Sequence, residues 1–568
     1  MGEDVKKDIN IIFKDNKKLF LIILVFSFIY GIGNVFVPIF IGNGLNNIVN
    51  NNILSIILIL FFSYIILFLS EIFASISLNK ISSSLSKKLR HNIFKKINTI
   101  KISYIDDMQI GDILNLINVD IENIVRVVNQ TSFKILSGIV TILGITIVII
   151  NINIILAIIL IISAPIMFII SKFIVNRTNI YFIRRADKIS DLNEYSEEII
   201  SKYKSIKNYM YEKEAIQKFE QINNNLYNIS LKAQFFSALT NPSSRFVINI
   251  IYILIGITGS ILAQKNIISV GEISTFLIYV NIYTRPFNEI TSYITEIQTG
   301  IVSINRIKAI LDKEDESNIE NNNMIKLKKC IEFKNVEFSY KKGNKFIENL
   351  NFVVNKNEKI AIVGKTGSGK TTLINLLMKF YNINNGSILI DGVDIQNIPN
   401  KILRKNIGVV LQDSKLFFGT IKENISYGNE IIDESDIRNL EEKLNLDSFI
   451  NRLYNGYDTI IENENMLSIG EIQLINIARL LLLKPQIVIL DEATSDLDIV
   501  TEKKIQNAIK EITENATSFI IAHRLSTIKN ADKILYMEDG NIIEQGSHEE
   551  LMRKKGKYFE LYSYYNTK

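Results

Sequence analysis

Scarce residue types limit what this sequence of 568 residues can do. A single cysteine, Cys330, excludes an intramolecular disulfide framework and any metal cluster held by several cysteines. Only three histidines are present, so a histidine metal site is not expected. The net charge of +5 is small for this length and gives no case for a nucleic-acid-binding protein.

Charged residues are also missing from long stretches of the first half. Hydrophobic residues make up 47% of the chain, and the mean hydropathy is positive. The uncharged run from Leu19 to Ser70 is too long for one membrane span, and the polar residues around Gly42–Asn52 divide it. A second uncharged run, Ile135–Ser171, is split in the same way at its asparagines. These patterns predict spanning helices near Leu19–Ile41 and Ile53–Ile76, in the two halves of Ile135–Ser171, and at Phe246–Gln264.

A sixth spanning helix is less distinct in the sequence. Ile273–Thr284 is uncharged but short, so we extend the predicted helix to about Ile267–Ile290, past Glu272 and Arg285. The alternative for this segment is a helix of a soluble domain.

Lysine and arginine are distributed unevenly between the predicted loops. They are frequent in two long segments, about Asn79–Gln130 and Lys172–Ser244, and absent from the loops after spans one and three. The positive-inside rule then places the N-terminus and everything after span six in the cytoplasm, although such basic runs are also common on solvated helix faces. Both segments have helical composition, so we expect long cytoplasmic helical extensions that reverse near Tyr104–Asp112 and Tyr203–Glu212.

The second half is organised around a phosphate-binding loop with the pattern G-x-x-x-x-G-K-[ST]. Its glycines allow backbone N–H groups to line a concave anion site, Lys370 can reach the outer phosphates, and the Thr371 hydroxyl can ligate Mg²⁺. An apolar strand, Lys359–Val363, precedes the loop and an apolar helix follows it. The candidate nucleotide contacts are Gly364, Lys365, Thr366, Gly367, Ser368, Gly369, Lys370, Thr371 and Thr372.

Two adjacent carboxylates follow a second apolar strand, Ile487–Leu490. A carboxylate at the end of such a strand can lie beside the Mg²⁺ held by Thr371, and we assign this metal-binding role to Asp491. Glu492 is then placed to polarise a water for attack on the γ-phosphate. The alternative, a solvated turn, does not account for the apolar strand before the pair.

Together with further motifs in the same order, these residues resemble a half-molecule of an ABC transporter of the exporter-fold class. The resemblance covers nearly the whole chain. It implies an α-helical polytopic membrane domain of six helices, followed by an α/β P-loop ATP-binding domain with antiparallel β and helical subdomains. The corresponding boundaries are residues 1–311 for the membrane domain, 312–330 for a linker and 331–568 for the ATP-binding domain. ATP and Mg²⁺ are the implied cofactors.

The same resemblance assigns roles to three residues outside the loop. Tyr340 would stack on adenine, although a core tyrosine is the alternative for an isolated match. Gln412 would contact Mg²⁺ and the attacking water. His523, which follows another apolar strand, would hold the γ-phosphate in geometry. Gln412 and His523, together with Lys370 and Glu492, form the expected catalytic set.

A segment that resembles the family signature implies a dimer. Its Ser468, Gly470 and Glu471 would face ATP bound to a second subunit, so one chain cannot build a complete site. This chain departs from the family at Ile469, where a second glycine is usual, and at Asp496, where a small residue is common. We therefore hypothesise a heterodimer in which this chain supplies the competent catalytic residues. A homodimer is the alternative.

The function implied is ATP-driven transport by alternating access, with a bacterial plasma membrane as the location. The expected cargo is an amphipathic drug, lipid or peptide, and the alternatives are an importer with the exporter fold, such as one for metallophores, and an ATP-gated channel or sensor. The spans show no cluster of like charge, so strongly ionic cargo is not expected. Polar residues inside the spans that could line a cavity, or bond neighbouring helices instead, are Asn34, Asn249, Asn281 and Tyr283.

Overall fold

The computed structural model describes residues 17–46, 53–316, 327–340, 345–411, 415–427, 434–463, 466–491, 499–521 and 528–566. The chain forms two compact units. The helical unit comprises Met1–Asn98 and Met108–Lys313, and the α/β unit comprises Thr99–Asp107 and Glu314–Lys568. A short piece of the first long loop therefore belongs to the α/β unit, although it lies far from the rest of that unit in the sequence.

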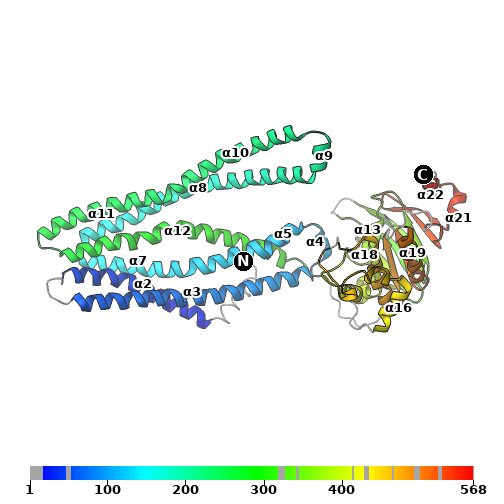
Figure 1. The fold of residues 1–568 in the computed structure, drawn as a ribbon, viewed down its shortest axis with the longest axis horizontal. Coiled ribbons are helices and arrows are strands. Elements are labelled where there is room, and N and C mark those ends of the chain that lie inside the picture. The colour runs from blue at the N-terminus through cyan, green and yellow to red at the C-terminus, as the bar shows by residue number, and fades with distance from the viewer. Residues whose placement is uncertain are drawn as a thin grey trace. The chain divides into compact units, whose positions relative to one another are not determined.

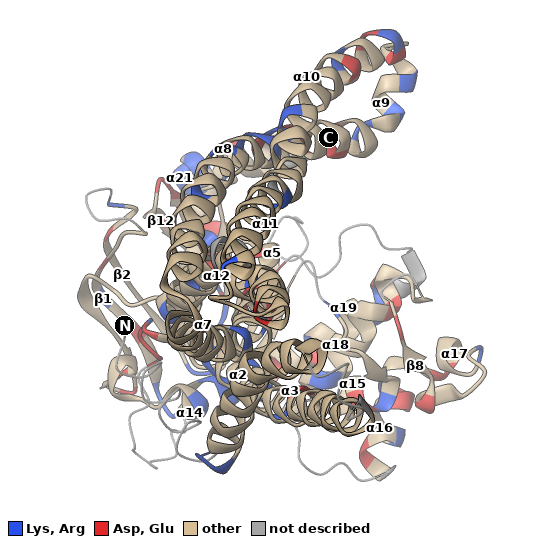
Figure 2. Cartoon of the chain, turned by 90° about the vertical axis from the view of Figure 1, so that its left-hand side faces the viewer, with Lys and Arg blue, Asp and Glu red and all other residues tan. Residues whose placement is uncertain are grey.

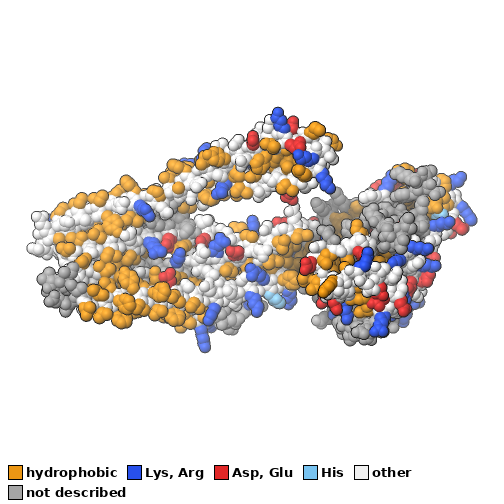
Figure 3. All heavy atoms as spheres, in the orientation of Figure 1, with side chains coloured by type: hydrophobic (Ala, Val, Ile, Leu, Met, Phe, Trp, Pro, Cys, Tyr) orange, Lys and Arg blue, Asp and Glu red, His pale blue; other side chains and the backbone are white. Residues whose placement is uncertain are grey.

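Long helices run side by side through the helical unit (Figure 1). The stretches predicted to span the membrane lie in α2 (Lys17–Asn46), α3 (Ile53–Ile97), α7 (Ser132–Ile152), α8 (Ile154–Ser201), α11 (Thr240–Gln264) and α12 (Val270–Leu311). Among the described residues, five helical segments are long and apolar enough to cross a membrane, and they contain all of these helices except α12. Apolar side chains cover much of the outer surface of this unit (Figure 3).

The helix α12 packs closely against α2 at a point where each helix carries a glycine. A Cβ atom added to Gly42 would lie 2.5 Å from the carbonyl oxygen of Gly271, and one added to Gly271 would lie 2.0 Å from that of Gly42. About two turns further along α12, the buried Tyr279 hydroxyl donates a hydrogen bond of 2.7 Å to the Val35 carbonyl on α2. Small residues and buried hydroxyls hold helices together in an apolar environment, so α12 joins the bundle without a strongly apolar surface of its own.

Two helical extensions continue beyond the apolar segments. One reverses at α9 (Tyr203–Asn208), between α8 and α10 (Glu212–Ala238), and it diverges from the other helices in Figure 1. Charged residues gather at its end (Figure 2). The other extension is built from α5 (Ile110–Asn115), η2 (Leu116–Asp120), α6 (Ile121–Arg126) and η3 (Val127–Thr131), and it continues into α7. The short helix α4 (Ile102–Asp106), which comes before α5 in the sequence, belongs to the α/β unit.

The α/β unit contains three sheets. The largest has the strand order β12-β11-β3-β10-β9-β6, and it is parallel except for the edge strand β12. An antiparallel sheet has the order β2-β1-β4-β5, and β7 pairs with β8. The strands are β1 (Cys330–Phe338), β2 (Ile347–Asn355), β3 (Lys359–Val363), β4 (Asn385–Ile390), β5 (Val393–Asp394), β6 (Ile407–Val410), β7 (Gly419–Thr420), β8 (Ile460–Ile461), β9 (Ile487–Asp491), β10 (Thr517–Ile521), β11 (Lys533–Glu538) and β12 (Asn541–Gly546).

Helices cover the parallel sheet on two sides. They are α13 (Lys370–Leu377), α14 (Asn400–Lys405), α15 (Ile421–Ser426), α16 (Glu434–Leu444), α17 (Asp447–Ile450), α18 (Ile469–Leu483), α19 (Ile499–Glu514), α21 (His548–Lys554) and α22 (Lys557–Asn566), with the short turns η4 (Ile395–Asn397) and η5 (Gly456–Asp458). Alternate residues of β3 enter different cores: Ile360 and Ile362 pack into one, Ala361 and Val363 into the other. This explains why β3 is apolar at successive positions. The predicted combination of a parallel core with antiparallel and helical parts is confirmed.

Candidate functional site

The phosphate-binding loop leaves β3 and enters α13, as the sequence predicts. Its three glycines, Gly364, Gly367 and Gly369, have φ angles of 155°, 83° and 102°, which other residues rarely adopt. A Cβ atom added to Gly364 would lie 2.2 Å from the carbonyl oxygen of Met537 on β11. The tight turn that opens the loop therefore requires glycine for both its backbone angle and its space.

Inside the loop, the Lys370 ammonium is held by backbone carbonyls. Its Nζ donates hydrogen bonds of 2.9 Å to both Gly364 and Lys365. The Ser368 hydroxyl is buried and has no hydrogen-bond partner among the described residues. Thr371 is exposed at the N-terminal turn of α13, where the helix dipole favours an anion. The ammonium, the orphaned hydroxyl and the glycine-lined space fit the phosphate groups of a nucleotide.

Beside the loop, an aromatic cluster positions Tyr340. Its hydroxyl lies 2.8 Å from the Thr372 hydroxyl, just after the loop. Its ring makes edge-to-face contacts with Phe338, Phe346 and Tyr381 at centroid distances of 4.8, 5.6 and 5.2 Å. Since the side chain is still 48% exposed, the ring is fixed in orientation while part of it remains open for stacking.

The Asp491 carboxylate lies at the carboxyl edge of the parallel sheet. In the strand register, Asp491 pairs with Ile521 of β10, which pairs with Ile362 of β3. Asp491 is thus level with a residue two positions before Gly364 and about 10 Å across the sheet from it, the width of two strand spacings. The strand order therefore puts this carboxylate on the same edge of the sheet as the phosphate loop.

The signature segment forms the N-terminus of α18. The Ser468 hydroxyl accepts a hydrogen bond of 3.3 Å from the Glu471 N–H, and the Glu471 carboxylate accepts one of 2.8 Å from the Ser468 N–H. Arg452 donates to the other Glu471 oxygen at 2.7 Å. Gly470 is buried, whereas Ile469 is 58% exposed at the tip of the helix. In this capping box Glu471 binds its own helix, and the open face of the helix terminus carries Ser468 and Ile469.

Three predicted catalytic residues, Gln412, Glu492 and His523, lie outside the described residues, as does Asp496. The strands that precede them are described. These strands, β6, β9 and β10, are adjacent and parallel, and they end at the edge of the sheet where the phosphate loop begins. The roles of these residues remain predictions.

Sequence reasoning missed Arg479, which joins α18 to α15 and to the aromatic residues on either side of α15. Its Nε donates a hydrogen bond of 2.9 Å to the Asn424 carbonyl, and its guanidinium lies over the rings of Phe417 and Tyr427. The Asn424 side chain in turn bonds both the N–H and the carbonyl of Phe417, each at 2.8 Å. The signal was present, because Arg479 is a lone cation in the apolar part of α18.

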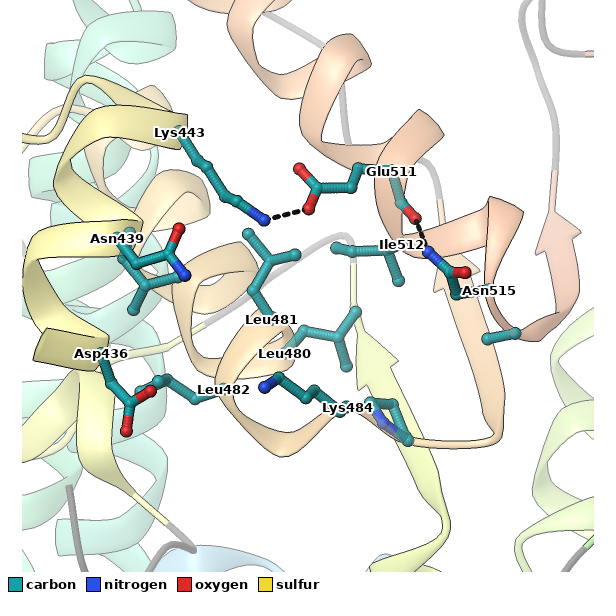
Figure 4. A pocket seen from close by; sticks show the side chains of 13 residues that line it. Asp436, Asn439, Lys443, Leu480, Leu481, Leu482, Lys484, Glu511, Ile512 and Asn515 are labelled. Carbon is teal, nitrogen blue, oxygen red and sulfur yellow. Dashed lines mark hydrogen bonds and ion pairs between the residues drawn. The ribbon is translucent and has the colours of Figure 1, made fainter. Parts of the chain in front are cut away.

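A separate cavity of about 280 Å³ lies between α16, α18 and α19 (Figure 4). Leu480, Leu481 and Ile512 line its apolar part, and Lys443 pairs with Glu511 beside it. It also borders the residues that lead into β9 and β10, so it lies at the amino ends of these strands. The phosphate loop is at their carboxyl ends, so this cavity is not part of the nucleotide site.

Comparison with known proteins agrees with this geometry. Residues 20–287 match the ABC transporter transmembrane region, and residues 347–495 match the ABC transporter family. Over 555 residues the chain is 37% identical to YfiC of Bacillus subtilis, an uncharacterized ABC transporter ATP-binding protein, and the match covers 96% of this chain and 92% of YfiC. The chain belongs to the ABC transporter family. It is an ATPase whose ATP hydrolysis is coupled to transport across a membrane.

Other ABC transporters are similar over most of their length. A fatty acid ABC transporter ATP-binding/permease protein of Mycobacterium bovis is 34% identical, with 84% of this chain and 75% of that protein covered. A probable multidrug resistance transporter of Bacillus subtilis, YheH, is 32% identical, with 84% and 71% covered. The fold matches the structure of a bacterial Atm1-family ABC exporter with ATP bound at a TM-score of 0.80 and 23% identity, covering 97% of this chain and 99% of that one.

Proposed function

We propose that this chain is one subunit of a dimeric exporter that moves an amphipathic compound out of the cell across a bacterial plasma membrane. The observation that carries the proposal is the fusion, in one chain, of a helical unit with exporter topology to a complete phosphate-binding loop. Two relatives are named for fatty acids and for multidrug resistance, and such cargo is mostly amphipathic. Their names support this class of substrate.

In this proposal the nucleotide is held between two subunits. Lys370 contacts the outer phosphates, Tyr340 stacks on the base, and Ser468 and Gly470 approach the nucleotide bound to the partner. The exposed helix terminus at Ser468 supports this arrangement, because it is open to a second subunit. Closure of the two α/β units over ATP then favours the outward-facing state.

Hydrolysis in this proposal needs Mg²⁺ and an activated water. Thr371, Asp491 and Gln412 would hold the Mg²⁺, Glu492 would polarise the water, and His523 would keep the γ-phosphate in place. Mg²⁺ held there would supply positive charge beside the phosphates. An exposed hydroxyl at the start of α13 and a carboxylate at the end of β9 are suitable oxygen ligands for this ion.

The test is ATP-driven transport in inside-out vesicles that contain the full chain and any subunit that co-purifies with it. We expect amphipathic probes to accumulate inside the vesicles with Mg²⁺ and ATP. Glu492→Gln should lower both ATPase activity and accumulation by about 100-fold or more, as expected for loss of a general base. Probe leaving the vesicles would instead indicate an importer. Flux that persists in Glu492→Gln would indicate an ATP-gated channel.

A further inference from the structure

A pocket with charged walls lies in the helical unit, among α2, α3, α7 and α12, and its volume is about 210 Å³. Blue and red side chains interrupt the apolar surface of this unit in Figure 3. The polar residues that matter here are Tyr30, Asn34, Glu71, Lys134, Arg285 and Glu289. Tyr30 and Asn34 lie in the middle of the apolar run of α2, at a depth where ionisable groups are costly and usually serve a function.

Two of these charges already neutralise each other. The Arg285 Nε donates to a Glu289 oxygen at 3.1 Å, one turn away on α12, and the Tyr293 hydroxyl donates to the other Glu289 oxygen. Glu71 on α3 and Lys134 on α7 differ. Within the residues that the structure describes, neither side chain forms a hydrogen bond or an ion pair with another. The pocket therefore offers one acid and one base, from different helices, that form no direct ion pair among the described residues.

Aromatic rings lie next to these charges. The rings of Tyr30 and Phe133 pack edge-to-face at a centroid distance of 5.3 Å, and both residues line the pocket. An aromatic face beside a carboxylate attracts an alkylated ammonium group, since the ring quadrupole and the carboxylate act in the same direction. Of the polar span residues singled out in the sequence, Asn34 and Asn281 also line this pocket, whereas Tyr283 is buried between helices.

We propose that this pocket binds the head group of a zwitterionic amphiphile, with the cationic group at Glu71 and Tyr30 and the anionic group at Lys134. The inference rests on the proposed export function and specifies its cargo. The two acids, Glu71 and Glu289, balance the two bases, Lys134 and Arg285, so the pocket has no net charge. A ligand of one sign would pair with either Glu71 or Lys134 and leave the other unpaired, whereas a zwitterion pairs with both.

The experiment is equilibrium binding of radiolabelled amphiphiles to the nucleotide-free dimer in lipid nanodiscs. The probes share a twelve-carbon tail: dodecylphosphocholine is zwitterionic, dodecyltrimethylammonium is cationic and dodecanoate is anionic. We expect the wild type to prefer the zwitterion over either ion by about tenfold or more. Glu71→Gln should shift the preference about tenfold towards dodecanoate, and Lys134→Met about tenfold towards dodecyltrimethylammonium. Matched controls on the exposed surface of α10, Glu220→Gln and Lys232→Met, should leave all three affinities unchanged.

A charge-swapped variant distinguishes a loss of binding caused by the missing charge from one caused by misfolding. Glu71→Lys combined with Lys134→Glu restores the balance of charge, so it should regain the preference for the zwitterion. Equal binding of the three probes to the wild type, or an equal loss of all three in both single variants, would overturn the proposal. Because the assay contains no ATP, selective binding without transport would uphold this inference and overturn the export function.

Discussion

At the scale of single residues, the role of Tyr340 can be tested apart from the phosphate loop. Base stacking on an aromatic ring contributes about 1–3 kcal/mol, so Tyr340→Ala should weaken ATP binding by about tenfold. Tyr340→Phe keeps the ring and loses the hydroxyl that meets Thr372, so its affinity should stay within about twofold of the wild type. Equilibrium dialysis with labelled ATP measures both. Unchanged affinity in Tyr340→Ala would mean that this ring only packs against its neighbours.

His548 makes the C-terminal helices sensitive to acid. Burial lowers its pKa, and its Nδ1 lies 2.7 Å from the hydroxyl of the buried Tyr558 on α22. In the unfolded chain the imidazole takes up a proton near pH 6.5, while the folded chain resists it. The stabilisation is thus complete above pH 6.5 and decreases as the pH falls towards the lower pKa of the folded state.

We therefore expect α22 to become more open between pH 7.5 and pH 5.5. Amide hydrogen exchange over Lys557–Asn566, corrected for the intrinsic pH dependence of exchange, measures this opening. In His548→Gln the difference between the two pH values should shrink, since glutamine does not titrate. The same difference in the variant and the wild type would assign the effect to another group.

At the scale of elements, a chain of contacts links the phosphate-loop helix to α4. Arg404 on α14 binds both carboxylate oxygens of Glu316 at 2.8 and 2.9 Å, and it also donates to carbonyls at the end of α13, 3.3 Å from Met378 and 3.2 Å from Lys379. The Glu316 N–H donates to the Thr99 carbonyl at 2.8 Å, just before α4. All of these residues belong to the α/β unit, so the contacts lie within one compact body.

This arrangement predicts that Arg404 transmits the nucleotide state to α4. Arg404→Met and Glu316→Gln should each lower transport per ATP hydrolysed by about tenfold, within the range expected for coupling energies of about 1–3 kcal/mol, while ATP affinity changes little. Transport and ATPase rates are measured in the same vesicles. Arg553→Met is the control, because it breaks a fully exposed pair with Glu549. A parallel fall of both rates would show damage to the fold rather than to coupling.

At the scale of the whole molecule, the signature segment at the start of α18 bears on whether the second subunit is a copy of this chain or a different chain. Ile469 exposes an apolar side chain at the end of α18, where the family usually has glycine. In the heterodimer we propose, the partner's signature completes the catalytic site of this chain, and the second site is impaired. Ile469→Gly should then raise the ATPase rate of the dimer by about twofold, as two competent sites replace one.

The matching measurement compares the chain expressed alone with the chain co-expressed with candidate partners. The heterodimer predicts an ATPase rate alone of about one tenth of the co-expressed value or less. A stable dimer of this chain alone with full activity would exclude the heterodimer and leave the homodimer.

Features carried by contiguous residues could be predicted from the sequence alone. The phosphate loop is one, since its glycines, its lysine and the flanking strand and helix follow one another within a few positions. The spanning helices are another, because a membrane requires an uninterrupted apolar run. The helix α12 was harder to recognise: its place in the bundle depends on close contact with α2 at Gly271, which leaves its composition mixed.

Only the tertiary structure decided which distant residues meet. No local pattern relates Glu71 to Lys134, which line one pocket, or Arg404 to Glu316, which form an ion pair. The first two come from separate helices, and the second two from a helix and the linker. Whether two such side chains lie close together depends on how each helix is rotated about its axis and on where distant parts of the chain pack, and the packing of the whole core sets both. The sequence by itself therefore determined that this chain binds a nucleotide at a membrane. The assembled fold decided which charges line the pocket and which contacts reach α4.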